Sequence, residues 1–314
     1  MISDKNMKTG SEDRNGMKQY LEEIMEQLKF PEASRDVFRK TKQKIDESAA
    51  WKKEFETVKE IFRKCPSIAI VPLLKRMEGL ADEMKIHPYT IHLLFYLEES
   101  EFLKQRYQEN GVEERWFWES MKDLKIKLME CLEVYGVSGT RAGHWHSGFF
   151  VDRIALGRLQ YEPRTFEGDF YKKNGYVVNR GDMVINIHIP SGESLTQEKC
   201  FESYKIAHEF FSPLFGQGKP TVFVCDSWLL DPESDTFLPP CNITRFKHNF
   251  DIINSRVDEE FHDKWRVFGK DYNKSIDELP RKTSVQRAYA EHLKQGGTVR
   301  TGYGIFLFDG EKIL

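Results

Sequence analysis

Apolar residues recur every three or four positions over much of the first 135 residues, which is the spacing of one face of an amphipathic helix. The clearest stripe consists of Tyr20, Leu21, Ile24, Met25 and Leu28. The spacing predicts helices over residues 20–28, 51–62, 91–102 and 116–134, and another after Pro31. Residues 68–74 are apolar and fit either a short strand or a buried helix. We therefore expect a helical N-terminal domain over residues 1–135, with a polar tail at residues 1–12.

The pattern changes after a stretch that is rich in glycine, which is typical of a loop at a domain boundary. The glycines are Gly136, Gly139, Gly143 and Gly148. Beyond them, short apolar runs predict strands over residues 153–162, 176–178, 183–189, 221–228, 265–268 and 299–308, with helices over residues 196–215 and 284–294. The order strand, helix, strand indicates a parallel pair within a mixed sheet. The expected fold class is therefore α+β, with a helical domain followed, over residues 136–314, by a mixed β-sheet flanked by helices.

Polar residues occupy alternate positions in two of the predicted strands. Arg158, Gln160 and Glu162 would share one face of the first strand, and Asn186 and His188 would share one face of another. A buried strand normally carries Val, Ile or Leu at such positions. Because burying polar groups costs free energy unless they pair or bind something, this polar face is where we expect the functional site.

A third polar run, Asp226, Ser227 and Trp228, ends the strand predicted over residues 221–228. Asp226 and Ser227 would point to opposite faces, so both can face one pocket only at a bulge. The residues expected to line the substrate cleft are Arg158, Gln160, Asn186, Asp226 and Trp228.

Two residues of the polar face are candidate general bases. Histidine side chains as a class titrate near neutral pH, so His188 could accept a proton from an amine or a hydroxyl group, although a histidine held in a polar network has the same pattern. Glu162 is the rival base, because apolar neighbours can raise the pKa of a carboxyl group. An ion pair with Arg158 or Arg164 is the alternative interpretation of Glu162.

The loop after His188 has small residues and leads into the helix predicted over residues 196–215. Ser194 with Gln197 fits a capping box, and Thr196 is the other candidate N-cap. The exposed N–H groups of a helix N-terminus suit a phosphate, although most capped helices bind nothing. Glu193 would repel an anion, and the loop has neither of the glycine patterns typical of nucleotide-binding loops.

Other catalytic and metal-binding patterns are absent from the sequence. His144 and His146 supply two metal ligands at most, so the stretch favours an ordinary loop and no metal. The five cysteines contain no Cys-x-x-Cys pair, and no Gly-x-Ser-x-Gly motif occurs.

Composition narrows the class of protein further. The 314 residues are 39% hydrophobic, which is enough for packed cores, and the formal net charge of −3 gives no basic bias towards nucleic acid or anionic membranes. The sequence contains no uninterrupted run of about 18 apolar residues, which is the length that a membrane helix needs. The polar first residues lack a signal-peptide core, so we expect a cytoplasmic protein that binds neither membrane nor nucleic acid.

Several segments resemble, in the same order, a family of bacterial GNAT-like acyltransferases. The segments are residues 157–162, 188–190, 226–232, 242–246, 290–297 and 300–302. The resemblance implies a helical N-terminal domain joined to a GNAT-like C-terminal domain, in which two splayed central strands admit an acyl-CoA or acyl-pantetheine donor. If residues 183–189 form the central strand, the donor pyrophosphate would meet Ile189, Ser191, Gly192, Ser194 and Thr196. The usual Gln/Arg-x-x-Gly-x-Gly/Ala loop is absent there.

The resemblance also implies a reaction. The acyl group would pass directly to the amine of a small-molecule acceptor, with Glu162 or His188 as the base and Tyr303 as proton donor to the leaving thiolate. Neither the acceptor nor the length of the acyl chain follows from the sequence.

Two other interpretations stay open. The missing phosphate loop beside a polar face also fits a non-catalytic module that binds a small molecule in a degenerate cleft. The helical half could instead dock a partner protein through an exposed patch of Trp116, Phe117 and Trp118.

Overall fold

The computed structural model describes residues 13–67, 70–216 and 218–314, so the tail expected at residues 1–12 lies outside the described part. The chain divides into two compact units. The helical unit comprises Met1–Phe117, Met121–Leu132 and Val137–Val151. The sheet unit comprises Trp118–Ser120, Glu133–Gly136 and Asp152–Leu314.

The described residues from Asp13 to Phe150 lie largely in helices, and every helix predicted there is present. The helices are α1 (Asp13–Gln27), α2 (Glu32–Glu47), α3 (Ala49–Lys64), α4 (Ile70–Met84), α5 (Pro88–Glu109), α6 (Glu114–Tyr135), α7 (Gly143–His146) and the 3-10 helix Ser147–Phe150. The described part of residues 68–74 is helical, which decides between the two alternatives. The glycine-rich stretch differs from expectation, because part of it forms α7.

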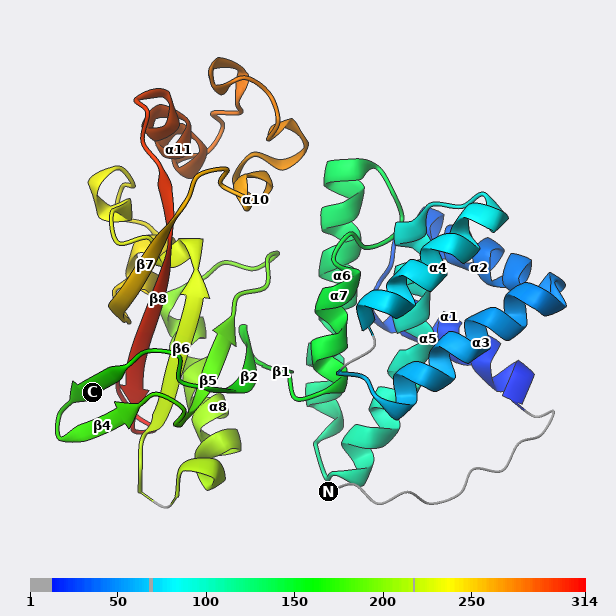
Figure 1. Cartoon of the computed structure of the whole chain (residues 1–314), viewed down its shortest axis with the longest axis horizontal. Coiled ribbons are helices and arrows are strands. Elements are labelled where there is room, and N and C mark those ends of the chain that lie inside the picture. Colours follow the sequence, from blue (N-terminus) through cyan, green and yellow to red (C-terminus); the bar gives the residue numbers. More distant parts are fainter. Residues whose placement is uncertain (1–12, 68–69, 217) are drawn as a thin grey trace. The chain divides into compact units, whose positions relative to one another are not determined.

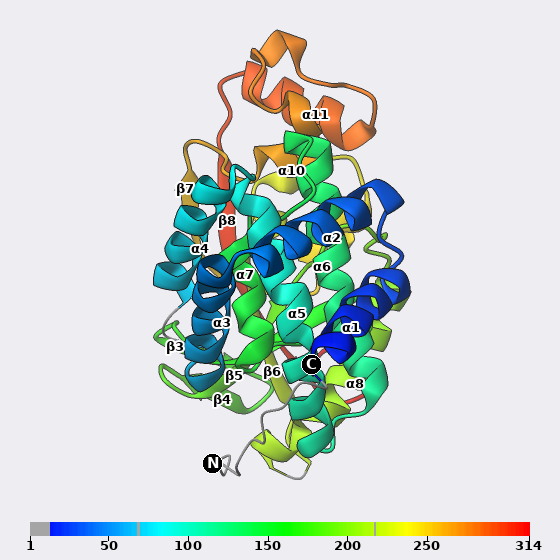
Figure 2. The ribbon, with the colours of Figure 1, turned by 90° about the vertical axis from the view of Figure 1, so that its right-hand side faces the viewer.

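Helix α5 is the centre of the helical unit. It contacts α1, α2, α3 and α4, and Figures 1 and 2 show these helices around it. Every residue from Thr90 to Ser100 is buried, so this part of α5 has no solvent-exposed face. The ring of Phe62 packs edge-on against Phe95 and Tyr96, with centroids 5.1 and 6.1 Å apart.

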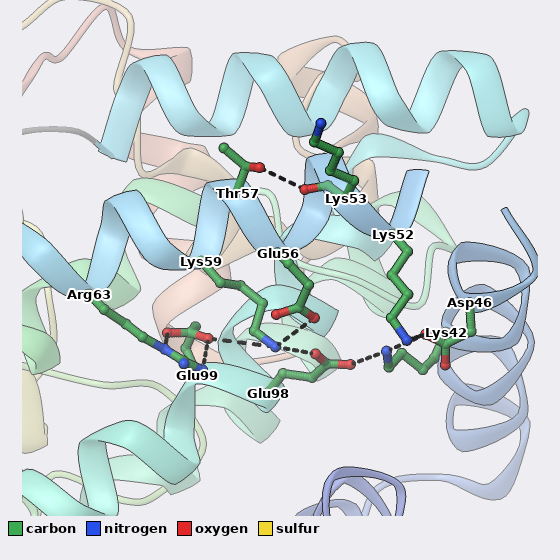
Figure 3. Close-up of polar contacts among 10 residues, drawn as sticks. All are labelled: Lys42, Asp46, Lys52, Lys53, Glu56, Thr57, Lys59, Arg63, Glu98 and Glu99. Carbon is green, nitrogen blue, oxygen red and sulfur yellow. Dashed lines mark hydrogen bonds and ion pairs between the residues drawn. The ribbon is translucent and has the colours of Figure 1, made fainter. Parts of the chain in front are cut away.

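Two adjacent carboxylates of α5 are buried in this core and are paired with basic residues of α3 (Figure 3). The Nζ atom of Lys59 lies 2.8 Å from Glu98 and 3.9 Å from Glu99. Arg63 donates two hydrogen bonds of 2.8 Å to Glu99, and Lys42 of α2 lies 3.6 Å from Glu98. Burial raises the pKa of Glu99, while the Arg63 guanidinium acts in the opposite direction. Because a buried charge is tolerated only when it is paired, this network aligns α3 with α5.

We expect Lys59→Met to lower the free energy of unfolding by about 3–5 kcal/mol, because Glu98 loses its nearest cation inside the core. Lys53→Met is the matched control, since Lys53 lies on the same helix with an exposed side chain. Urea unfolding followed by circular dichroism measures the difference. Equal stability of the two variants would contradict a structural role for the network.

The second unit is built on a six-stranded sheet in the order β1-β2-β5-β6-β8-β7 (Figure 1). Its strands are β1 (Ile154–Leu156), β2 (Leu159–Thr165), β5 (Met183–His188), β6 (Thr221–Ser227), β7 (Asp251–Asp258) and β8 (Val299–Phe308). Only β5 and β6 are parallel neighbours among the described strands. Strands β3 (Phe170–Lys173) and β4 (Tyr176–Asn179) form a separate hairpin. The α+β fold with a mixed sheet is therefore confirmed.

Helices flank and follow the strands. They are α8 (Gln197–Phe215), α9 (Asn242–Lys247), α10 (Lys264–Phe268), α11 (Ser284–Lys294) and the 3-10 helices Trp228–Leu230, Ser234–Thr236, Gly269–Asp271 and Ile276–Glu278. The strand predicted at residues 265–268 is wrong, because these residues belong to α10. Strands β3 and β7 were not predicted. The strand predicted over residues 153–162 is two antiparallel strands, with a turn at Gly157, whose φ of 73° suits glycine.

The two faces of the sheet are covered differently. Helix α8 packs on one face, where the ring of Tyr204 lies 4.9 Å from that of Phe306. On the other face, Phe166, Tyr171 and Val178 pack on strand residues that include Val184, Val224 and Ile305. We call this second side the hairpin face, because the β3–β4 hairpin supplies Tyr171 and Val178. The hairpin is tied to β7 by a 2.6 Å hydrogen bond from Tyr171 to Asp251.

Candidate functional site

The pairing of β2 with β5 places four of the predicted polar residues together. Gln160 lies opposite His188, and Glu162 lies opposite Asn186. Residues opposite each other in antiparallel strands share a face, so all four point to one side. Asn186 pairs with Val224 of β6, which identifies that side as the hairpin face. The predicted polar face is therefore confirmed for these four residues.

The carboxylate of Glu162 is the centre of this polar group, and its residue is only 2% exposed. Its Oε2 lies 2.5 Å from Nε2 of His188 and 3.1 Å from Nη2 of Arg153. Its Oε1 pairs with Arg164. These partners compensate the buried charge, so the ion pair foreseen with Arg164 is present, together with one that was not foreseen.

Arg153 was missed because the predicted strand placed it on the face away from Glu162. The turn at Gly157 reverses the chain, and β1 then pairs with β2 so that Ile154 lies opposite Tyr161. Arg153 is consequently next to Glu162, and it is 7% exposed. A glycine within a strand-like run was the signal for this turn.

The contact with Glu162 determines which nitrogen of His188 can act as a base. A hydrogen on Nε2 points at the carboxylate, which leaves the lone pair of the neutral ring on Nδ1. The amide of Asn186 lies 3.2 Å from Nε2 and adds to the packing around it. The side chain of His188 is 17% exposed, compared with 3% for Glu162. Of the two candidate bases, His188 is thus the more accessible.

Strands β5 and β6 part beside this pair. Their parallel register covers only Ile185 with Phe223 and Asn186 with Val224. Strand β5 continues to His188 and β6 continues to Ser227, yet no further pair joins them in the described residues. His188 and Asp226 are each two residues beyond the last pair, so both lie on the hairpin face at the two edges of the gap. The two central strands therefore share no backbone pair at this end, which is the condition for the splay that the resemblance implies.

The loop from β5 to α8 is held by side chains on both sides. The hydroxyl of Thr196 accepts a hydrogen bond from the Lys199 amide and caps α8. The capping box predicted at Ser194 is wrong, because the Ser194 hydroxyl accepts a 2.9 Å hydrogen bond from Asn242 instead. Glu193 is neutralised by Lys199 at 2.7 Å.

Arg158 is not part of the polar face. Its side chain instead holds the loop between β5 and α8. It lies in the turn before β2, and its guanidinium donates to the carbonyl oxygens of Glu193 and Ser194 at 2.8 and 3.3 Å. The expectation that it shares a face with Gln160 fails because β2 begins only at Leu159. Ile189 and Ser191 are half-buried, whereas Gly192 is exposed with a φ of 99°.

Tyr303 and Asp226 lie on the other side of the gap. They are opposite each other on β8 and β6, and the Asp226 carboxylate takes hydrogen bonds of 2.9 and 2.8 Å from Arg256 of β7. Tyr303 is half-buried and stacks on Phe166. Burial is the main cause that raises the pKa of Tyr303. In the strand order β5-β6-β8, Tyr303 lies two strands from His188.

Trp228 does not lie beside the gap with Tyr303 and Asp226. It begins a 3-10 helix after β6 and is 9% exposed. Its ring packs on Phe261 and Tyr289, with centroids 5.6 and 5.7 Å away. The expectation that Trp228 lines the cleft is therefore wrong, because the chain leaves the sheet one residue earlier than predicted.

The remaining sequence candidates have ordinary structural environments. His146 is buried and lies 3.3 Å from both Asp123 and Thr140. His144 is two residues away on α7, where side chains do not share a face. No group of three or more metal-ligating side chains occurs in the described residues. No helix among them has the length and apolar character needed to span a membrane.

The aromatic residues at the start of α6 do not form the exposed patch required for partner docking. Trp116 and Phe117 are buried, and Trp118 is half-buried. The ring of Phe117 packs edge-on against Tyr107 of α5.

Comparisons with known proteins agree with the two-part organisation. Residues 19–150 match a family model described as an N-acyltransferase N-terminal domain. Residues 154–306 match one described as a GNAT-like C-terminal domain. No curated protein matches the chain significantly.

Solved structures share the fold over most of the chain. An acyltransferase in complex with decanoyl-CoA and teicoplanin has a TM-score of 0.71 and 22% identity, over 92% of this chain and 88% of that one. An acyltransferase mutant in complex with octanoyl-CoA has a TM-score of 0.68 and 18% identity, over 92% and 88%. An acyltransferase in complex with CoA and 10C-teicoplanin has a TM-score of 0.68 and 20% identity, over 92% and 87%.

We expect Glu162→Gln to lower the free energy of unfolding by about 3–5 kcal/mol, because the buried Arg153 guanidinium loses its ion pair with this carboxylate. Glu193→Gln is the matched control, since its exposed bridge to Lys199 contributes less than about 1 kcal/mol. Urea midpoints of the two variants test this. An unchanged midpoint for Glu162→Gln would show that the buried cluster adds no stability.

Proposed function

Because the chain belongs to the GNAT-like acyltransferase family, in which an N-acyltransferase N-terminal domain precedes a GNAT-like C-terminal domain, we propose that it transfers an acyl group from acyl-CoA directly to the amine of a small-molecule acceptor. The observation that carries the proposal is the gap between β5 and β6 with the Glu162–His188 pair at its edge. Decanoyl-CoA and octanoyl-CoA in the similar structures support an acyl-CoA donor.

The donor pyrophosphate would lie at the loop before α8. The first amides of a helix have no intrahelical partner and carry a partial positive charge, which suits a phosphate. Arg158 and Lys199 add positive charge at this loop, and Lys199 neutralises Glu193. The anchoring of the loop by Arg158 and Asn242 would give it the fixed shape that glycine-rich phosphate loops obtain from their backbone.

The pantetheine arm would enter the gap between β5 and β6, which places the thioester near His188. The acceptor nitrogen would attack the thioester carbon while its proton passes to Nδ1 of His188. Amides of β5 that face the gap would stabilise the negative oxygen of the tetrahedral intermediate. The carbon–sulfur bond would then break, and the thiolate would take up a proton to give CoA and the amide product. Holding both reactants side by side supplies much of the rate enhancement.

Glu162 would act as a positioning residue rather than as the base. Its oxygens are occupied by Arg153, Arg164 and His188, and its residue is 2% exposed. It would hold the tautomer of His188 in which Nδ1 accepts the proton. Gln160 and Asn186 flank the pair, opposite His188 and Glu162.

Tyr303 is the proposed proton donor to the leaving thiolate. Its raised pKa keeps the phenol protonated at neutral pH. It lies on β8, next to β6 and therefore on the side of the gap away from His188. Separating the acid from the base across the gap suits a reaction in which the attacking nitrogen and the departing sulfur lie on different sides of one carbon.

The second candidate function is a binding module that holds an acyl-CoA without transferring it. The missing glycine pattern after His188 favours this alternative. It differs from the enzyme in one measurable respect, because it would bind the donor and release no CoA in the presence of any amine.

We expect octanoyl-CoA and decanoyl-CoA to bind the full chain in calorimetric titrations. Arg158→Ala should weaken binding about tenfold, because it removes both charge and loop support. Lys294→Ala is the control and should bind the donor normally. It removes an exposed lysine at the end of α11 that is paired with Asp277. No binding at millimolar donor would rule out both the enzyme and the module.

We expect His188→Ala to reduce kcat by about 10²–10⁴-fold while donor binding is unchanged, since general base catalysis contributes a factor of that size. Release of CoA measured with a thiol reagent tests the rate, and calorimetry tests the binding. Equal kcat in His188→Ala and the wild-type protein would exclude His188 as the base.

A positioning role for Glu162 has a separate signature. Glu162→Gln should move the acid limb of the kcat/KM pH profile to lower pH, because the imidazolium loses the anion beside it. The limb should return towards the wild-type position in Glu162→Asp. A loss of rate with an unmoved profile would indicate that Glu162 acts only on stability.

A further inference from the structure

A cavity of about 390 Å³ opens on the hairpin face of the sheet unit, next to the site described above. Its lining includes Glu167, Asp169, Phe170, Asp226, Arg256 and Tyr303. These residues come from β3 and the segment before it, and from β6, β7 and β8, so the cavity lies within one unit.

The cavity adjoins the gap between the parallel strands on the side away from His188. Asp226 is two residues beyond Val224, which is the last residue of β6 that pairs with β5. Tyr303 lies opposite Asp226 on the next strand. Strand spacing sets the separation from His188 to the cavity at about 5–10 Å or more, because β5 and β6 part between them. A small acceptor that reaches His188 at one end would place its other end here.

The charges of the lining favour a cation. Asp226 is paired with Arg256, and Asp169 is paired with Arg180. Glu167 is exposed and has no ion pair within 4.0 Å among the described residues, although Arg256 lies near enough to interact with it electrostatically. Three carboxylates and two guanidinium groups therefore give the lining a net charge of −1.

Two further properties of the cavity exclude other occupants and add affinity for an ammonium group. An excess of carboxylate repels the phosphates of CoA, and a charged lining does not suit an acyl chain. Phe170, which is 59% exposed, and Tyr303 offer aromatic rings to a cation. The side-chain amide oxygen of Asn254 can accept a hydrogen bond from it.

We propose that the acceptor carries a second cationic group, which binds beside Glu167 in this cavity while the reacting amine lies at His188. The inference rests on the proposed acyl transfer, and it names the substrate class as compounds with two amino groups about 5–10 Å apart. Selection would act on the charge of the remote group, because the reacting group is the same amine in every substrate.

Three compounds of equal length test the remote charge. They are 1,5-diaminopentane, 5-aminopentan-1-ol and 5-aminopentanoate, each acylated with decanoyl-CoA by the full chain. We expect kcat/KM for the diamine to exceed that for the amino alcohol about fivefold, which is the upper range for a partly exposed ion pair. The amino acid should be the poorest substrate, because its carboxylate meets Glu167.

Variants of Glu167 make the test specific to the cavity. Glu167→Gln should bring the ratio between diamine and amino alcohol close to one, and Glu167→Lys should favour the amino acid. Glu311→Gln removes an exposed carboxylate beyond the end of β8 and should keep the wild-type ratio. Equal kcat/KM for all three compounds in the wild-type protein, or a ratio that survives Glu167→Gln, would overturn the proposal while leaving acyl transfer intact.

Failure of the proposed function has a different outcome. If decanoyl-CoA binds but no amine is acylated, the transferase proposal fails, and the cavity is then tested by calorimetric titration of 1,5-diaminopentane. Weaker binding by Glu167→Gln than by Glu311→Gln supports a cation site that is independent of transfer. Identical binding by both variants overturns it.

Discussion

A buried carboxylate organises the sheet unit. Removing an ionised carboxylate from water costs several kcal/mol, and only partners of opposite charge with good hydrogen-bond geometry offset that cost. The partners of Glu162 come from the residue before β1, from β2 itself and from the end of β5. The register of three strands is therefore coupled to one ion cluster. The orientation of His188 at the edge of the gap is a consequence of the same coupling.

Opposite electrostatic preferences lie on the two sides of that gap. The loop before α8 is supported by Arg158 and Lys199, whereas the cavity beside β6 has an excess of carboxylate. An anionic donor and a cationic acceptor, as proposed above, would therefore be drawn to different places, and neither would compete for the other's position. Because long-range attraction is screened over about 8 Å at physiological salt, this sorting acts within the site rather than during approach.

Side-chain alternation was enough to predict the polar face, because Gln160, Glu162, Asn186 and His188 lie in regular strands. The same rule failed for Arg153 and Arg158, which flank a turn that reverses direction at Gly157. Periodicity cannot distinguish a short apolar strand from a helical turn, which explains the error at residues 265–268. Strand β7 could not be predicted from the apolar pattern, because an edge strand needs no such pattern and its residues are largely exposed. Cavity residues such as Glu167 and Arg256 are far apart in sequence, so only the tertiary structure brings them together.

The position of β8 in the sheet limits when the sheet unit can finish folding during synthesis. Neighbouring helices of the first unit contact each other, so these local contacts can form as soon as the helices exist. Strand β8 comes last along the chain but lies between β6 and β7. Until residues 228–298 have been synthesised and β8 follows, β6 presents an unpaired edge that can pair with another chain. Nascent or truncated chains are therefore most prone to aggregate through β6, and a chaperone that shields this edge would improve the yield of folded protein.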